Sequence, residues 1–191
     1  MRKYKIALAV VGVGMLLALS AHAQTATIVL PPTDLENFEL QTNTVIVKGS
    51  SLVGSVALDS NSSFVIHARE ANDIGHSQKA YGITVELSGS LPSGAPAKMQ
   101  MVVDYDELDS LTTAFDYIGK VTWGVTQLNS FEADYATRSG FHVVAHSDRR
   151  QSVINTFIQF GNLPRLPISS DQLAQMRSLV AQAKSTLDSL K

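Results

Sequence analysis

The side chains able to do chemistry are few and scattered, and the histidines are the first candidates. His142 and His146 lie four residues apart in FHVVAH, a segment typical of a β-strand because aromatic and β-branched residues dominate it. On a strand both side chains point to the same face, about 13 Å apart at a rise of about 3.3 Å per residue. Zinc holds its ligands at roughly 2.0–2.1 Å, so the pair cannot share one ion. We expect two half-exposed histidines.

A second group of titratable residues surrounds the end of another predicted strand. His67 belongs to the segment SFVIHAR, and His76 lies in the polar segment 72–78, with Glu70 and Asp73 close by in sequence. These residue types serve in metal and catalytic sites, but their spacing matches no recognised motif. The pattern favours polar residues of a solvated turn.

Four carboxylates gather where a helix is predicted to begin: Asp104, Asp106, Glu107 and Asp109. An EF-type calcium loop needs glycine at its sixth position, and that position, counted from Asp104, holds Asp109. Negative charge at a helix N-terminus is stabilising by about 0.3–1 kcal/mol per group, which explains the cluster without an ion. No metal site is predicted.

The arginine pair Arg149 and Arg150 lies in a predicted hairpin turn, 147–151. A solvated turn is the expected environment, and contact with a small anion or a partner is the alternative. The chain contains neither a nucleophile elbow nor a glycine-rich phosphate loop followed by lysine and a helix. We therefore predict no catalytic residue and no cofactor, and we retain His67, His76, His142, His146, Arg149 and Arg150 as surface candidates.

Strands and helices must position these residues, and the hydropathy pattern predicts both. Period-two patterns rich in β-formers predict strands at 44–48, 52–58, 63–69, 81–87, 98–103, 121–125, 131–137, 141–146 and 153–160. The patterns at 52–58 and 121–125 are the weaker ones. Residues 161–167 are expected to be a loop. Residues 35–40 predict a short helical segment. Polar residues 138–140 predict a hairpin turn.

Two longer segments change to a period of 3.6 and predict amphipathic helices. The first follows Asp104, with Glu107 at the capping-box spacing and Gly119 expected in a left-handed conformation at its end. The second starts after Ser169, with Gln172 as the capping partner. The prediction is an α+β fold: an antiparallel β-sheet of about seven or eight strands covered by two amphipathic helices.

The two helix starts resemble each other, since 103–108 and 168–173 match in chemical type position by position. One interpretation is a tandem β-meander-plus-helix unit. The other is that capping alone produces this pattern, because every helix must satisfy its first N–H groups. The second interpretation is favoured, because the strands share no matching residues.

The N-terminus has the three parts of a secretory signal peptide. Basic residues Arg2, Lys3 and Lys5 precede an apolar run, 6–19, and a small-x-small cleavage pattern ends before Gln24. We predict a signal peptide at 1–23, a tether at 24–34 and a single domain at 35–191, exported to the periplasm or secreted. The alternative is that the apolar run stays uncleaved as an anchor.

The net charge narrows the classes of partner, and the cysteine content indicates how the fold is stabilised. The formal net charge is −2, and removal of the signal peptide makes the chain more acidic, which excludes nucleic acid and anionic lipid as expected partners. No membrane span is predicted after cleavage. The chain has no cysteine, so the fold rests on its apolar core without disulfides.

Several segments of the second half, among them VVDYDELDSL, FDYI, FEADY and TRSGF, together with SDQL and QAK near the C-terminus, resemble a family of uncharacterised bacterial exported proteins of unknown function. The resemblance covers most of the chain from Tyr81 to the C-terminus. It implies a bacterial, signal-bearing protein, and it supplies no catalytic residues.

The sequence favours a non-enzymatic domain that binds a partner protein or small ligand on its sheet or hairpin tips. Two alternatives from other classes stay open: a hydrolase or metal-dependent enzyme using the histidines and carboxylates, and a structural envelope component. The identity of the partner and the oligomeric state stay open as well.

Overall fold

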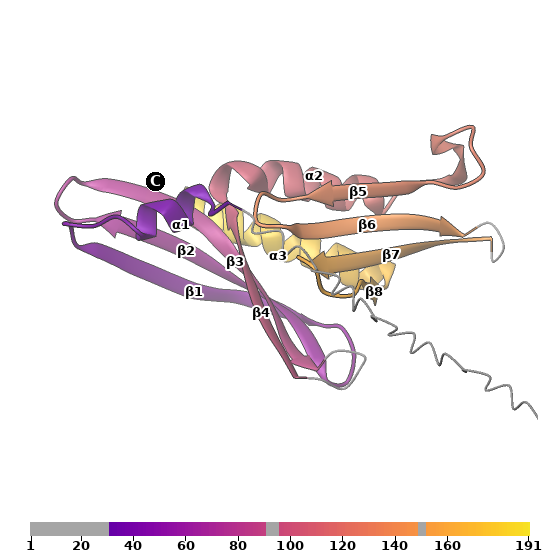
Figure 1. Ribbon diagram of the computed structural model, residues 1–191, viewed down its shortest axis with the longest axis horizontal. Helices are drawn as coiled ribbons and strands as arrows, with labels where there is room; N and C mark the ends of the chain where they lie inside the picture. The colour runs from indigo at the N-terminus through magenta and orange to yellow at the C-terminus, as the bar shows by residue number, and fades with distance from the viewer. Residues whose placement is uncertain (1–30, 91–95, 149–151) are drawn as a thin grey trace, which may run out of the picture.

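Two antiparallel four-stranded sheets and two long helices build an α+β fold, as the sequence predicts (Figure 1). The computed structural model describes residues 31–90, 96–148 and 152–191. The predicted signal peptide, 1–23, lies outside these residues. Within the described residues, no helix combines the length and the apolar character needed to cross a bilayer.

The first sheet is a meander of four consecutive strands. The strands β1 (Ile46–Ala57), β2 (Ser62–Asp73), β3 (Gln78–Ser90) and β4 (Pro96–Asp104) lie side by side in that order. The predicted strands 44–48 and 52–58 form one strand, β1, with a register shift between Leu52 and Gly54. Gly54 is needed there because a Cβ atom would lie 2.7 Å from Cδ2 of Leu179 in the last helix.

The second sheet repeats the meander with shorter strands. Its order is β5 (Glu132–Ala136), β6 (Phe141–Asp148), β7 (Val153–Phe160) and β8 (Leu166–Ile168). The β5–β6 turn is the predicted hairpin, in which Gly140 has φ of 82° and donates its N–H to the Thr137 carbonyl at 2.9 Å. The meander places β5 and β8 at the two edges of the sheet.

Each long helix follows one sheet in sequence and packs on the other. After β4 come the 3₁₀ turn η1 (Tyr105–Glu107) and α2 (Leu108–Ile118), which packs on β5 and β6. The C-terminal helix α3 (Ser170–Asp188) follows β8 but packs on β1 and β2 and alongside α2. The tandem β-meander-plus-helix arrangement is therefore present, with the helices exchanged between the two units.

One continuous apolar core joins both sheets and both helices. At its centre Phe64 of β2 meets Phe141 of β6 and Phe160 of β7, with ring centroids 5.3–6.5 Å apart. A smaller cluster lies on the opposite face of the first sheet, where Leu35 of α1 (Asp34–Glu39) covers Ala71 and Val102. Because the halves share one core, neither sheet buries its apolar face alone.

Three local predictions are wrong for identifiable reasons. Residues 121–125 do not form a strand, because Trp123–Val125 is a 3₁₀ turn, η2, whose Trp123 ring meets Phe131 edge-on. The end of the expected loop, 166–167, forms the strand β8 together with Ile168, and Pro164 and Pro167 hide this strand in the sequence. Gly119 has a right-handed backbone conformation, with φ of −68°. Glycine suits this position because a Cβ atom would lie 3.1 Å from Cδ2 of Leu173 in α3.

Candidate functional site

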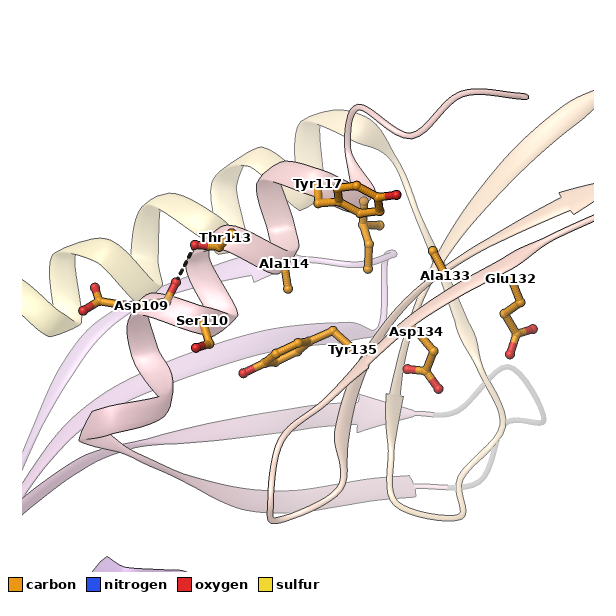
Figure 2. Close-up of a pocket in the computed structure, with 10 residues that line it drawn as sticks. Asp109, Ser110, Thr113, Ala114, Tyr117, Glu132, Ala133, Asp134 and Tyr135 are labelled. Carbon is orange, nitrogen blue, oxygen red and sulfur yellow. Dashed lines mark hydrogen bonds between the residues drawn. The ribbon is translucent and has the colours of Figure 1, made fainter. Parts of the chain in front are cut away.

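An open groove of about 710 Å³ runs between α2 and the edge strand β5 (Figure 2). Helix α2 lines one side with Asp109, Ser110, Thr113, Ala114, Tyr117 and Ile118. Strand β5 lines the other with Glu132, Ala133, Asp134 and Tyr135. Ala114 of α2 and Ala133 of β5 contribute only small side chains to this lining.

Two tyrosines give the groove its chemical character. Tyr117 stands at the rim and is 54% exposed, whereas Tyr135 reaches from β5 beneath Ser110 and Ala114 (Figure 2). Burial raises the pKa of Tyr135, and the carboxylates of Glu107 and Asp106 add to the rise. The Tyr135 hydroxyl is therefore protonated at neutral pH and able to donate a hydrogen bond to a ligand. Aromatic surface with a polar tip is typical of binding sites.

The backbone of β5 is open along the side that faces away from β6. Phe131 accepts from the N–H of Ser147 and Thr137 donates to Phe141, which fixes the alternation of hydrogen bonds along the β5–β6 ladder. Ala133 and Tyr135 then bond to β6, and the N–H and C=O groups of 132, 134 and 136 point outward. The described residues supply no partner strand on that side.

The face of the second sheet turned away from the core, its outer face, carries a network of charges. Glu132 accepts two hydrogen bonds from Arg165, at 2.6 and 2.8 Å, and lies 3.5 Å from Nδ1 of His146. The Arg165 hydrogen bonds lower the pKa of Glu132. Asp134 lies 3.0 Å from Nδ1 of His142. Both carboxylates at this edge are partly exposed, and each contacts a histidine of β6.

His142 and His146 lie on the same face of β6, as predicted, and each pairs with a different carboxylate of β5. Arg149 and Arg150 lie outside the described residues. The sequence did not suggest the groove, because the pairing of β5 with β6 and the packing of α2 over them are set by topology.

The other histidines are separated along the first sheet. His67 points to the face opposite Ile66 and Ala68, and His76 lies in the β2–β3 turn. Asp73 organises that turn: its carboxylate accepts from the hydroxyl of Thr44, the N–H of Gly75 at 2.8 Å and the His76 ring at 2.7 Å. These bonds, that from Thr44 above all, lower the pKa of Asp73 to about 2. The group is a structural turn.

The predicted carboxylate cluster has a partner that sequence reasoning missed, Arg138 in the β5–β6 turn. Its guanidinium contacts Asp34 at 2.7 Å and Asp104 and Glu107 at 3.4 Å, and it also bonds Asp106. Burial opposes the charge of Arg138, but the bonds to Asp106 and Asp34 outweigh it and raise its pKa. We call these five residues the Arg138 node.

The node ties distant segments together. Asp104 at the end of β4 accepts the N–H groups of Asp34 and Leu35, both at 2.8 Å, and so caps α1. Glu107 accepts the N–H of Arg138 at 2.9 Å. Asp34, Asp104 and Asp106 form the one group in the described residues close enough to hold a metal ion, and Arg138 supplies the positive charge there. The node is a structural clamp.

A comparison with protein-family models finds no match, and a comparison with curated proteins also finds none. The groove and its edge strand are therefore the features from which a function can be inferred.

Proposed function

We propose that this chain is an exported, non-enzymatic binding domain that takes an extended segment of a partner protein in the α2–β5 groove. The observation that carries the proposal is the coincidence of an open groove with the free backbone edge of β5. Edge strands are used in this way when a peptide adds as a further strand and its alternate side chains fill pockets.

The lining of the groove supports binding rather than bond-making. Ala114, Ala133 and Ile118 present apolar surface, and Tyr117 and Tyr135 add aromatic surface with hydroxyl groups. The Thr113 hydroxyl donates to the Asp109 carbonyl of its own helix at 2.9 Å. Ligand-binding pockets combine apolar surface with a few polar groups in this way.

Exposed apolar side chains extend the surface beyond the groove. A second hollow of about 540 Å³ shares Thr113 and Tyr117 with the groove and continues to Val125. Val125, which lines this second hollow, is 45% exposed. Contiguous apolar surface beside a groove is typical of interaction sites.

Site-specific photo-crosslinking tests the proposal. A photoreactive phenylalanine analogue replaces Tyr117 at the rim, and a matched probe replaces the exposed Ser50 on β1 of the other sheet. We expect the Tyr117 probe alone to form an adduct in the cells that make the protein, with the crosslink mapped by mass spectrometry to one short partner segment. Equal adducts from both positions, or none, would overturn the groove assignment.

Export is tested separately. Fractionation of the same cells, followed by N-terminal sequencing, should recover the chain outside the cytoplasm with Gln24 as its first residue. A cytoplasmic chain that retains residues 1–23 would overturn this part of the proposal.

A further inference from the structure

We infer that the occupant of the groove is a segment of alternating apolar and basic residues, which pairs antiparallel with β5. This inference rests on the proposed function and names the chemistry of its partner. Three features carry it: the hydrogen-bond register of the free edge, the apolar lining on one side of β5 and the carboxylates on the other.

The register decides which partner residues lie opposite which residues of β5. The backbone groups of 132, 134 and 136 face outward, so an antiparallel partner forms its hydrogen-bonded pairs at these positions. Partner residues at those pairs share the outer face with Glu132 and Asp134. The residues between them lie opposite Ala133 and Tyr135 and share the groove face.

The groove face selects apolar side chains. Ala133 and Tyr135 are half-buried beside Ala114, Tyr117 and Ile118 of α2. A partner side chain that points this way leaves water and enters the groove. Burial of apolar surface contributes about 25 cal/mol per Å², so valine-sized groups are favoured over charged ones.

The outer face selects basic side chains. Opposite charges directly across a pair of strands stabilise it, and like charges destabilise it. The bidentate contact of Arg165 with Glu132 shows that a guanidinium fits on this face, and it leaves both oxygens of Glu132 engaged. Asp134, which is partly exposed beside His142, is the carboxylate that an incoming cation would meet.

The same carboxylates disfavour a second copy of the chain as occupant. In a symmetric antiparallel pairing that overlaps all of β5, Asp134 would lie opposite Asp134 of the other copy. Charged residues on edge strands commonly prevent such self-pairing. Charge complementarity therefore points to a basic segment of a different protein.

Binding of synthetic peptides to the whole mature chain tests the inference. The probes are fluorescently labelled ten-residue peptides that alternate valine with lysine, or valine with glutamate, measured by fluorescence anisotropy. We expect the valine–lysine peptide to bind at least tenfold more tightly. N-methylation of alternate backbone amides, on the edge that faces β5, should abolish its binding.

Charge reversal supplies the matched controls. Asp134→Lys should weaken the valine–lysine peptide about tenfold and strengthen the valine–glutamate peptide. Asp59→Lys makes the same charge change in the exposed β1–β2 turn and should change neither affinity. Equal affinities for the two peptides, retention of binding after N-methylation, or equal effects of the two variants would overturn the inference.

The two proposals fail in different ways. If the Tyr117 probe captures a partner segment but the valine–lysine peptide does not bind, the groove stands and the basic–apolar chemistry is wrong. If the Tyr117 probe captures nothing, the proposed function fails whatever the peptides do.

Discussion

Replacement of Arg138 tests whether one arginine clamps the N-terminal helix, the end of β4 and the β5–β6 turn. Arg138→Met keeps the aliphatic stem and removes the charge. The Arg138 side chain is 40% exposed, so solvent screens its ion pairs with Asp34 and Asp106. Such pairs contribute about 0.2–1 kcal/mol each. Asp104, 3% exposed, loses its cation and keeps two backbone N–H groups.

The expected loss of stability in Arg138→Met follows from these contacts. Two screened pairs together with an uncompensated, nearly buried carboxylate destabilise the protein by about 2–3 kcal/mol. For a chain of this size that lowers the melting temperature by roughly 5–10 °C. Urea unfolding followed by circular dichroism gives the free energy of unfolding.

Arg165→Met is the matched control, because Arg165 has similar exposure but forms its ion pair with the single carboxylate of Glu132. We expect a loss of about 0.5–1 kcal/mol there. High salt should reduce the difference between the two variants, since it screens repulsion among the remaining carboxylates of the Arg138 node. Equal losses for Arg138→Met and Arg165→Met would refute the clamp.

Three further predictions test other parts of the structure. The pKa of Asp73 is lowered from 3.8 to about 2, so its ionised form stabilises the fold above pH 3.8, and this stabilisation is lost as pH falls toward 2. Asp73→Asn should therefore be less stable at pH 7, and its free energy of unfolding, measured by urea titration, should depend less on pH. An unchanged pH dependence would count against the turn assignment. Phe64→Ala should lower the free energy of unfolding by about 3–5 kcal/mol and shift the unfolding of both halves together, so that the circular dichroism and Trp123 fluorescence transitions coincide. Separate transitions would contradict a shared core. Gly82→Ala should lower the free energy of unfolding by about 1–3 kcal/mol, because its Cβ would lie 2.6 Å from the Val103 carbonyl oxygen. Gly49→Ala should lower it less, because the nearest neighbours of its Cβ would lie at 3.9 Å. Thermal melts that rank the two variants the other way would contradict the close packing at Gly82.

Local physics explains which elements were predictable. The start of α3 follows from Ser169 and Gln172, whose reciprocal hydrogen bonds at 3.1 and 2.8 Å are the predicted capping box. The strands around Phe64, Val85 and Val143 follow from their alternation, because one face of each meets the core. These signals lie within a few residues of one another in sequence.

The remaining features depend on contacts between distant segments. Alternation shows which face of a strand is buried but not which helix covers it, so the exchange of α2 and α3 between the two sheets has no local signal. Arg138 meets Glu107 across 31 residues and Asp34 across 104, which is why it resembles an ordinary turn residue in the sequence. The groove depends in the same way on β5 being an edge strand.

The most direct test of the central claim, that β5 is an open edge which pairs with a partner strand, is amide hydrogen exchange by NMR. In the free protein, the amides of Ala133 and Tyr135 should be protected by β6, and those of Glu132, Asp134 and Ala136 should exchange rapidly. Addition of the valine–lysine peptide should slow exchange at Asp134 and its two outward-facing neighbours and leave Ala133 and Tyr135 unchanged. Unchanged exchange at Asp134 in the presence of bound peptide would contradict the account.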